Sequence, residues 1–200
     1  MGLKIDYISG QTPLDDEELQ GLLDKHVFTR QDLDEVEHEN VNKASLWLGR
    51  SRISQERLLS EKFVKQLHKK MFGNVWSWAG EFRLSDKSIG VSWHQIAVEL
   101  KKLFDDCRYW IDNKTFSEEE IAVRFKHRLV SIHPFNNGNG RHSRLMADAI
   151  MEKIFKKPQF NWGGISLEAE NDGRSKYIRA LHDADNGNYK SLLEFATSVC

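Results

Sequence analysis

The feature that most constrains this chain is residues 133–144, which read HPFNNGNGRHSR and separate two apolar runs. Both runs, residues 121–132 and 145–151, repeat apolar side chains every three or four positions, as helices packed in a core do. Pro134 cannot continue the first helix, and Gly138 lets the backbone turn sharply. We therefore predict two core helices joined by a tight loop, with the second helix beginning near residues 139–141.

The start of that second helix is suited to bind an anion, because its first backbone N–H groups are free and its dipole is positive there. Arg141 and Arg144 are three residues apart, which places both guanidinium groups on the first turn, and guanidinium groups match phosphate oxygens. His133, at the other end of the loop, carries an imidazole that can take a proton near neutral pH. We interpret the stretch as a phosphate-binding loop with a general base. The alternative is a Gly/Asn turn with a surface histidine and solvated arginines.

These residues resemble the signature of the Fic/Doc family, H-x-F-x-[D/E]-G-N-G-R-x-x-R, with Asn137 at the acidic position. The resemblance extends to residues 67–83 and 177–181. The chain as a whole looks most like the bacterial Fic subgroup called mobile mystery protein B, which is associated with mobile-element regions and a helix-turn-helix companion protein. The residues that fall on the signature are His133, Phe135, Gly138, Asn139, Gly140, Arg141 and Arg144.

The resemblance implies a protein adenylyltransferase, which transfers AMP from ATP to a serine, threonine or tyrosine hydroxyl of a target protein. In that activity His133 would accept the proton of the attacking hydroxyl. Arg144 would clamp the terminal phosphates, Arg141 would support charge on the leaving pyrophosphate, and Phe135 would anchor the loop without taking part in the chemistry. Backbone N–H groups and the side chain of Asn139 would hold phosphate oxygens. The expected nucleotide-binding residues are Asn137, Gly138, Asn139, Gly140, Arg141 and Arg144.

Asn137 departs from the pattern at the position where the family's acidic residue holds a magnesium ion. An amide oxygen can ligate Mg²⁺, but it brings no negative charge, so we expect weaker metal binding at Asn137. Three outcomes stay open: a slow transferase, a transferase with another donor, or a protein that has lost catalysis. The alternative function is therefore a catalytically impaired Fic-fold module that binds nucleotide or a partner and is linked to a mobile element.

Residues 75–91 alternate aromatic and polar side chains between turn formers, which predicts the only β-hairpin of the chain. An edge hairpin can receive a target segment as an added strand. The alternative is an ordinary loop pinned by Trp76 and Trp78, and the resemblance to the family's target-binding flap favours the hairpin. The predicted target-binding residues are Lys87, Ser88, Ile89, Gly90 and Val91.

The remaining sequence predicts a mainly helical, Fic-like fold. The chain has 200 residues, of which 40% are hydrophobic, so it can bury a core as a single domain. Residues 1–50 would form a helical extension and residues 55–200 the core. The helices outside the central pair are expected at residues 13–25, 32–48, 60–72, 94–110, 173–184 and 191–199.

Composition argues against several classes of protein. A net charge of −1 without a basic stripe gives no reason to expect direct contact with nucleic acid or an anionic membrane, which makes a DNA-associated regulator a weak hypothesis. Cys107 and Cys200 lie far apart and fit two reduced thiols of a cytoplasmic protein. The sequence shows no apolar signal core and no run long enough to span a membrane.

A few single residues carry interpretations of their own. We expect His68 to be a histidine at the edge of the core and His142 an exposed residue of the helix's first turn. Many family members carry an inhibitory glutamate that pairs with the second arginine. Residues 166–171 match the spacing S-x-x-x-E-N, and Glu37 and Glu39 lie on an N-terminal helix, but all of these fit surface carboxylates.

Overall fold

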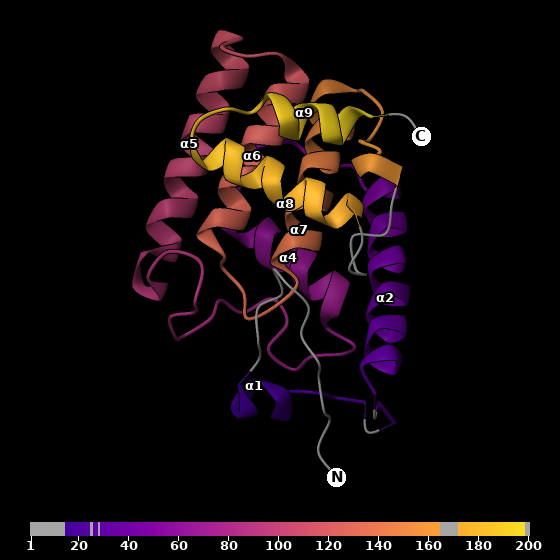
Figure 1. The fold of residues 1–200 in the computed structure, drawn as a ribbon. Helices are drawn as coiled ribbons and strands as arrows, with labels where there is room; N and C mark the ends of the chain where they lie inside the picture. Colours follow the sequence, from indigo (N-terminus) through magenta and orange to yellow (C-terminus); the bar gives the residue numbers. More distant parts are fainter. Residues whose placement is uncertain (1–14, 25, 28, 165–171, 199–200) are drawn as a thin grey trace.

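The structure is a computed structural model that describes residues 15–24, 26–27, 29–164 and 172–198. In these residues the fold is all-helical, with nine α-helices and no strand (Figure 1). A π-helical turn, Ile150–Phe155, continues the seventh helix, and short 3₁₀ helices lie at Trp93–Gln95 and Trp162–Gly164. The α-helices are α1 (Asp16–Gln20), α2 (Arg30–Arg50), α3 (Gln55–Leu58), α4 (Glu61–Phe72), α5 (Ile96–Asn113), α6 (Glu118–Ile132), α7 (Asn139–Ala149), α8 (Asp172–Asp185) and α9 (Lys190–Thr197).

The two helices predicted around the central loop, α6 and α7, form the middle of the molecule. Figure 1 shows α5 on one side of them, α2 on the other, and the pair α8 and α9 across their front. Helices α6 and α7 pack on each other, α5 packs on α6, and α4 packs on α2 and α7. The side chains of Phe125 on α6 and Met146 on α7 are completely buried. The site loop is therefore held between elements of the core.

Local sequence signals account for several helix ends. Ser60 caps α4 by accepting a hydrogen bond from the Phe63 N–H, and Ser117 caps α6 in the same way. Helix α4 ends at Phe72, as predicted, and Gly73 follows it. Helix α1 is shorter than predicted, because Asp15 caps it with Glu18 at capping-box spacing and it ends at Gln20. The predicted start of this helix, before residue 15, lies outside the described residues.

The predicted β-hairpin is absent from residues 75–91, so that part of the expected fold is wrong. An isolated bridge between Leu22 and Trp76 is the one β-type pairing recorded in the described residues. The segment satisfies its backbone elsewhere: the Arg83 N–H donates to the Pro134 carbonyl at 3.0 Å. The Val91 N–H donates to the Ile132 carbonyl at 3.3 Å. The segment is an irregular loop: its own backbone hydrogen bonds are short turns, and its longer-range ones join it to residues 21–23 and to the end of α6.

Helix α2, in the predicted N-terminal extension, shares the core of the rest of the chain. Its buried residues Leu33, Ala44 and Leu48 belong to the same hydrophobic cluster as Phe63 and Met146. The boundary between extension and core stays a prediction. Among the helices of the described segments, none combines the length and the apolar character that a membrane span requires.

Candidate active site

The loop between α6 and α7 turns through two left-handed residues. Helix α6 ends at Ile132, and His133 adopts φ 55° and ψ 60°, which is uncommon for a residue with a side chain. Gly138, at φ 76°, precedes the first residue of α7, and a Cβ atom there would lie 2.5 Å from the Phe72 ring. The backbone therefore requires glycine at this position, and the predicted start of the second helix near residues 139–141 is confirmed, because α7 begins at Asn139.

Asn139 fixes the shape of the loop. It is buried, its Oδ1 accepts a hydrogen bond from the Phe135 N–H at 3.0 Å, and its Nδ2 donates to the Phe135 carbonyl at 2.8 Å. Phe135 is completely buried, as expected of an anchor. Because the Asn139 amide is engaged at both ends inside the loop, its side chain orders the backbone there. Its expected contact with a phosphate oxygen stays a prediction.

His68 holds the same loop from below. Its Nδ1 accepts a hydrogen bond from the Gly80 N–H at 3.0 Å, so Nε2 carries the proton and donates to the Asn137 carbonyl at 3.1 Å. The imidazole stacks on Phe135 with ring centroids 3.7 Å apart. Burial, together with the neighbouring His142, keeps the pKa of His68 well below its usual value. His68 is thus a neutral, fully buried link between two loops, and lies deeper than the core edge that we expected.

A pocket of about 590 Å³ opens above the loop, a size typical of small-molecule sites. It is bounded by the start of α7 and by residues of α6 and α8, and the N-terminal turn of α2 reaches it through Arg30 and Asp34. The structure brings all the predicted catalytic and nucleotide-binding residues to this one pocket. Asn139 is among them, but its side-chain amide is turned into the loop. The predicted residues that line the pocket are His133, Asn137, Gly138, Asn139, Gly140, Arg141 and Arg144.

His133 lines the pocket while only 4% of its surface is exposed. Burial, the largest cause, and the positive charges of Arg83 and Lys87 together lower the pKa of His133 from 6.5 to about 4. A hydrogen bond to the Val130 backbone acts in the opposite direction. The imidazole is therefore neutral at pH 7, which is the state that a proton acceptor needs.

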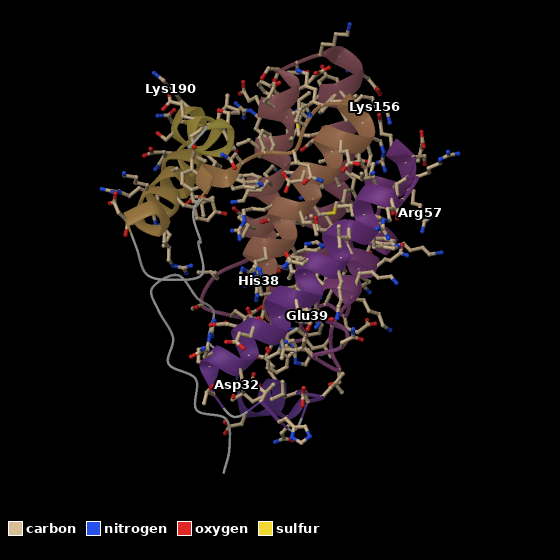
Figure 2. The ribbon with its side chains drawn as sticks, turned by 90° about the vertical axis from the view of Figure 1, so that its right-hand side faces the viewer. Asp32, His38, Glu39, Arg57, Lys156 and Lys190 are labelled. Atoms are coloured by element: carbon tan, nitrogen blue, oxygen red, sulfur yellow. The ribbon has the colours of Figure 1, made fainter. Side chains whose placement is uncertain are left out.

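The two arginines of the loop have different surroundings. The Arg141 Nη2 atom forms a 2.6 Å ion pair with the Glu37 carboxylate on α2, whose other oxygen accepts from the Trp76 Nε1 at 2.6 Å. Glu37 is 2% exposed, so its interpretation as a surface carboxylate is wrong. Glu39 is exposed and pairs with Lys43, on the face of α2 that Figure 2 turns toward the viewer. The candidate glutamate in residues 166–171 lies outside the described residues.

Arg144 stays at the pocket wall beside α8. Its guanidinium carbon lies 5.7 Å from the centroid of the Tyr177 ring, and the Lys126 Nζ lies 4.4 Å from the same centroid. Burial lowers the pKa of Lys126, which is completely enclosed. Two cations therefore flank one aromatic ring at the side of the pocket, and Arg144 can face a phosphate chain there.

The residues at the expected metal position do not form a protein-held magnesium site. The Asn137 Oδ1 accepts a hydrogen bond from the adjacent Gly138 N–H at 2.6 Å. In the parts of the chain that the structure describes, no group of three histidine, cysteine or acidic side chains could hold a metal ion. Magnesium sites of this kind use one or two carboxylates together with substrate phosphates. Asn137 supplies only a neutral amide oxygen, which is already engaged.

The predicted target-binding segment reaches the pocket with its middle. Ser88, Ile89 and Gly90 line the pocket, and half of the Ile89 surface is exposed. Lys87 points elsewhere, because its Nζ forms a 2.5 Å ion pair with Glu18 of α1. The Val91 N–H donates to the Ile132 carbonyl at the end of α6. The segment therefore borders the pocket as a loop and not as a hairpin.

Two buried residues near the site were not predicted. His142 is completely buried and shares a hydrogen bond with the Val64 carbonyl at 3.0 Å, so its expected exposure is wrong. Its spacing from Leu145 and Met146, three and four residues on, places it on the same core face and could have revealed this. Arg83 is 1% exposed and contacts the carbonyl of His133. No local pattern signals that contact.

Comparison with known proteins shows what this chain is similar to. Residues 58–151 match the model of the Fic/DOC family. The chain is 24% identical over 166 residues to the protein adenylyltransferase Fic of Aedes aegypti, which covers 80% of this chain and 32% of that protein. It is 28% identical over 171 residues to the protein adenylyltransferase fic-1 of Caenorhabditis elegans, and this alignment covers 80% of this chain and 31% of that protein. The chain spans about a third of the length of these relatives.

Solved structures support the same fold. The structure of Fic-1 from C. elegans aligns with a TM-score of 0.66 and 24% identity, covering 88% of this chain and 51% of that one. BepC, a translocated effector of Bartonella tribocorum solved with bound AMPPNP, aligns with a TM-score of 0.65 and 19% identity, covering 90% and 96%. An N-terminal Fic domain from Bartonella quintana aligns with a TM-score of 0.68 and 17% identity, and the alignment covers 84% of this chain and 82% of that one. The fold of this chain is therefore that of Fic domains.

Proposed function

We propose that this protein is an adenylyltransferase that moves AMP from ATP to a hydroxyl group of a target protein. One observation carries the proposal: a single pocket is lined by a neutral histidine, the N–H groups at the start of α7, Arg144 and an exposed loop. A base, an anion site and a border for a polypeptide are the parts that this transfer needs. The similarity to Fic adenylyltransferases and the AMPPNP bound by BepC support the same choice.

The reaction assigns one step to each group. The hydroxyl oxygen of the target attacks the α-phosphorus, and the imidazole of His133 takes the hydroxyl proton. The bond from the α-phosphorus to the bridging oxygen breaks, and pyrophosphate leaves. The N–H groups of residues 138–141 stabilise charge on the phosphates, and the Arg144 guanidinium holds the departing end. Arg141 adds its charge to the extent that Glu37 releases it.

Magnesium would enter this site with the nucleotide, held chiefly by the phosphates, and would supply charge neutralisation. The Asn137 side chain would add at most one neutral oxygen after giving up its hydrogen bond to Gly138. We therefore expect a higher magnesium requirement than an acidic residue at this position would give.

A second candidate function is a module that binds nucleotide without turnover. Asn137 favours it, because the residue lacks the charge that the family places there. Replacing Asn137 by aspartate separates the two possibilities. A gain of transfer from an inactive wild type would show that the protein is a catalytically impaired module, whereas measurable transfer by the wild type supports the transferase.

The test is transfer of label from ATP to protein in an extract with magnesium. We expect label from the α-phosphate to appear on protein, and label from the γ-phosphate not to. His133→Ala should lower the rate by at least about 100-fold. His26→Ala, which removes an exposed histidine outside the pocket, is the matched control and should change nothing. Equal labelling by wild type and His133→Ala would contradict the proposal.

The partners of the reaction follow from the same resemblance. We propose that the target protein docks against Ser88, Ile89 and Gly90, because these residues border the pocket. If the chain belongs to the mobile mystery protein B subgroup, it would also have a helix-turn-helix companion protein. Ile89→Asp should weaken transfer to the target without changing nucleotide affinity, and unchanged transfer would refute the docking site.

A further inference from the structure

Arg83 is an unusual residue near the pocket, because its guanidinium group is buried and yet is directed mainly at backbone carbonyls. Its Nε donates to the His133 carbonyl at 2.7 Å, and its Nη1 donates to the Ser85 carbonyl at 2.8 Å. Its Nη2 donates to the Val91 carbonyl and lies 3.5 Å from the Ile132 carbonyl. The one carboxylate beside it, on Asp86, lies 3.6 Å away and is mostly exposed. A guanidinium group has the five donors that such an arrangement uses.

The contacts of Arg83 satisfy carbonyl groups at the C-terminal end of α6. The last carbonyls of a helix have no partner within the helix, and a cation stabilises them and the negative end of the dipole. Here the cation comes from residue 83, and the Arg83 backbone adds a third bond, to the Pro134 carbonyl at 3.0 Å. Three successive carbonyls, from residue 132 to residue 134, therefore contact Arg83.

This matters for His133 because its backbone is strained. A left-handed conformation costs a residue with a Cβ about 1 kcal/mol or more, and it persists only where its surroundings hold it. Arg83 contacts the His133 carbonyl directly, and the packing around it leaves no room for adjustment. A Cβ atom added to Gly90 would lie 2.7 Å from the His133 Cβ and 2.9 Å from the Arg83 Nη2.

The same side chain also reaches both ends of the loop that borders the pocket. Ser85 and Val91 flank the segment containing Ser88, Ile89 and Gly90, and their carbonyls accept from one guanidinium group. Arg83 therefore connects the loop at the pocket mouth to the turn that carries the base.

We infer that Arg83 is the positioning residue of this site: it holds His133 in its left-handed turn and ties that turn to the loop at the pocket mouth. The inference rests on the proposed function for its effect on rate. Its effect on the imidazole itself does not depend on any activity. In this role Arg83 touches neither nucleotide nor target and acts through His133.

Electrostatics gives the inference a specific readout. Burial, then the charge of Arg83, then that of Lys87 lower the pKa of His133. Loss of the Arg83 charge should raise that pKa, and it should stay below 6.5 because burial remains. The other charged or titratable groups around the pocket come from helices α2, α6, α7 and α8. They are Arg141 and Arg144 from α7, the Arg30–Asp34 pair from α2, and His127, Arg174, Tyr177, His182 and Asp185 from α6 and α8.

The experiment compares Arg83→Gln and Arg83→Lys with the wild type. Nuclear magnetic resonance of labelled histidine rings, assigned with His133→Gln, should show the His133 pKa rising by about one unit in Arg83→Gln and by much less in Arg83→Lys. In α-phosphate transfer, kcat should fall about 10- to 100-fold in both variants, because lysine keeps the charge but not the fork. Nucleotide affinity should change less than about threefold, since the phosphate-binding N–H groups stay in place.

The matched control is Arg108→Gln, which removes another arginine that donates to a backbone carbonyl, that of Leu59, away from the pocket. It should leave the His133 titration and kcat unchanged. If Arg83→Gln fails to fold, Gly90→Ala replaces it, because the added Cβ separates His133 from Arg83 and keeps the charge. It should lower kcat with a small change in pKa.

Two results would overturn the inference. The first is that both Arg83 variants have the same His133 pKa and the same kcat as the control Arg108→Gln. The other is a loss of kcat in Arg83→Gln accompanied by an equal loss of nucleotide affinity, which would indicate general disruption. If the wild type transfers no label, the proposed function fails, and the histidine titration still decides the role of Arg83.

Discussion

Glu37 and Arg141, 104 residues apart in the chain, form a 2.6 Å ion pair that links α2 to the start of α7. Glu37 is almost fully buried, and the Arg141 side chain is 16% exposed. A carboxylate at this distance neutralises much of the charge that Arg141 could offer to a phosphate. If the pocket binds a nucleotide as we propose, the pair opposes that binding while it stabilises the fold.

Glu37→Gln should separate these two effects. Glutamine keeps an oxygen for the Trp76 Nε1 donor and removes the negative charge. We expect nucleotide affinity to rise about threefold or more, because Arg141 becomes available to phosphate. We expect the free energy of unfolding to fall by about 1–3 kcal/mol, because a largely buried guanidinium loses its anion. Calorimetric titration with ATP and urea denaturation measure the two quantities.

Glu39→Gln is the control for this variant, since Glu39 is on the same helix but exposed, and it should change neither quantity. Weaker nucleotide binding by Glu37→Gln would show instead that Glu37 orients Arg141 for the phosphates.

The rate of transfer should persist in mildly acidic solution. Burial and the charges of Arg83 and Lys87 lower the pKa of His133 from 6.5 to about 4. The neutral imidazole, which is the base, therefore predominates at all pH values above about 4. Single-turnover rates should stay nearly constant from pH 8 down to about pH 5 and then fall. A loss of rate centred near pH 6.5 would show that His133 is solvated in the working enzyme.

Asp148 should make the stability of the protein depend on pH in an unusual direction. Burial raises the pKa of Asp148 from 3.8 to about 7, although Trp162 and the Phe160 N–H donate hydrogen bonds to it. Between these two pH values the unfolded state loses the proton and the folded state keeps it. The contribution of Asp148 is therefore most favourable below pH 3.8 and declines as pH rises to about 7, by up to about 4 kcal/mol.

Asp148→Asn removes this contribution while keeping an acceptor for Trp162. The free energy of unfolding of the variant, minus that of the wild type, should increase between about pH 4 and about pH 7. Using the difference cancels the titration of other groups. A difference that is constant with pH would mean that Asp148 ionises normally in the folded protein.

Gly138 should tolerate no side chain. Its φ is 76°, and an added Cβ would lie 2.5 Å from the Phe72 ring. Gly138→Ala should lower the free energy of unfolding by about 2–4 kcal/mol, the sum of backbone strain and overpacking. It should also weaken nucleotide binding, because the first turn of α7 must move. Thermal and urea denaturation with ATP titration measure both effects.

Gly187→Ala is the matched control, since Gly187 has φ 83° and open space around its Cβ position. It should cost about 1 kcal/mol from strain alone. Equal losses in the two variants would mean that contact with Phe72 is unimportant.

Features written in short stretches of sequence were predictable. Pro134 and Gly138 define the loop, and Ser60 and Ser117 mark helix starts, because each acts on the backbone within a few residues of itself. The alternating pattern of residues 75–91 was misleading. Such a pattern indicates side chains on two faces of a strand, but the backbone of this segment forms hydrogen bonds with the end of α6.

Features that depend on distant residues were not predictable in this way. The burial of Glu37 requires α2 to pack on α4 and α7, and its two donors come from residues 76 and 141. The contacts of Arg83 likewise join segments about fifty residues apart. The residues of the pocket could be named from their resemblance to a family, whereas the residues that orient them required the fold.

The central claim is that the start of α7 binds a polyphosphate with His133 at the α-phosphate, and a crystal structure with a non-hydrolysable ATP analogue tests it most directly. We predict the phosphates against the N–H groups of residues 138–141 and Arg144, and an imidazole nitrogen within about 4 Å of the oxygen that would attack the α-phosphorus. Phosphates bound elsewhere, or an imidazole turned away from the nucleotide, would contradict the account.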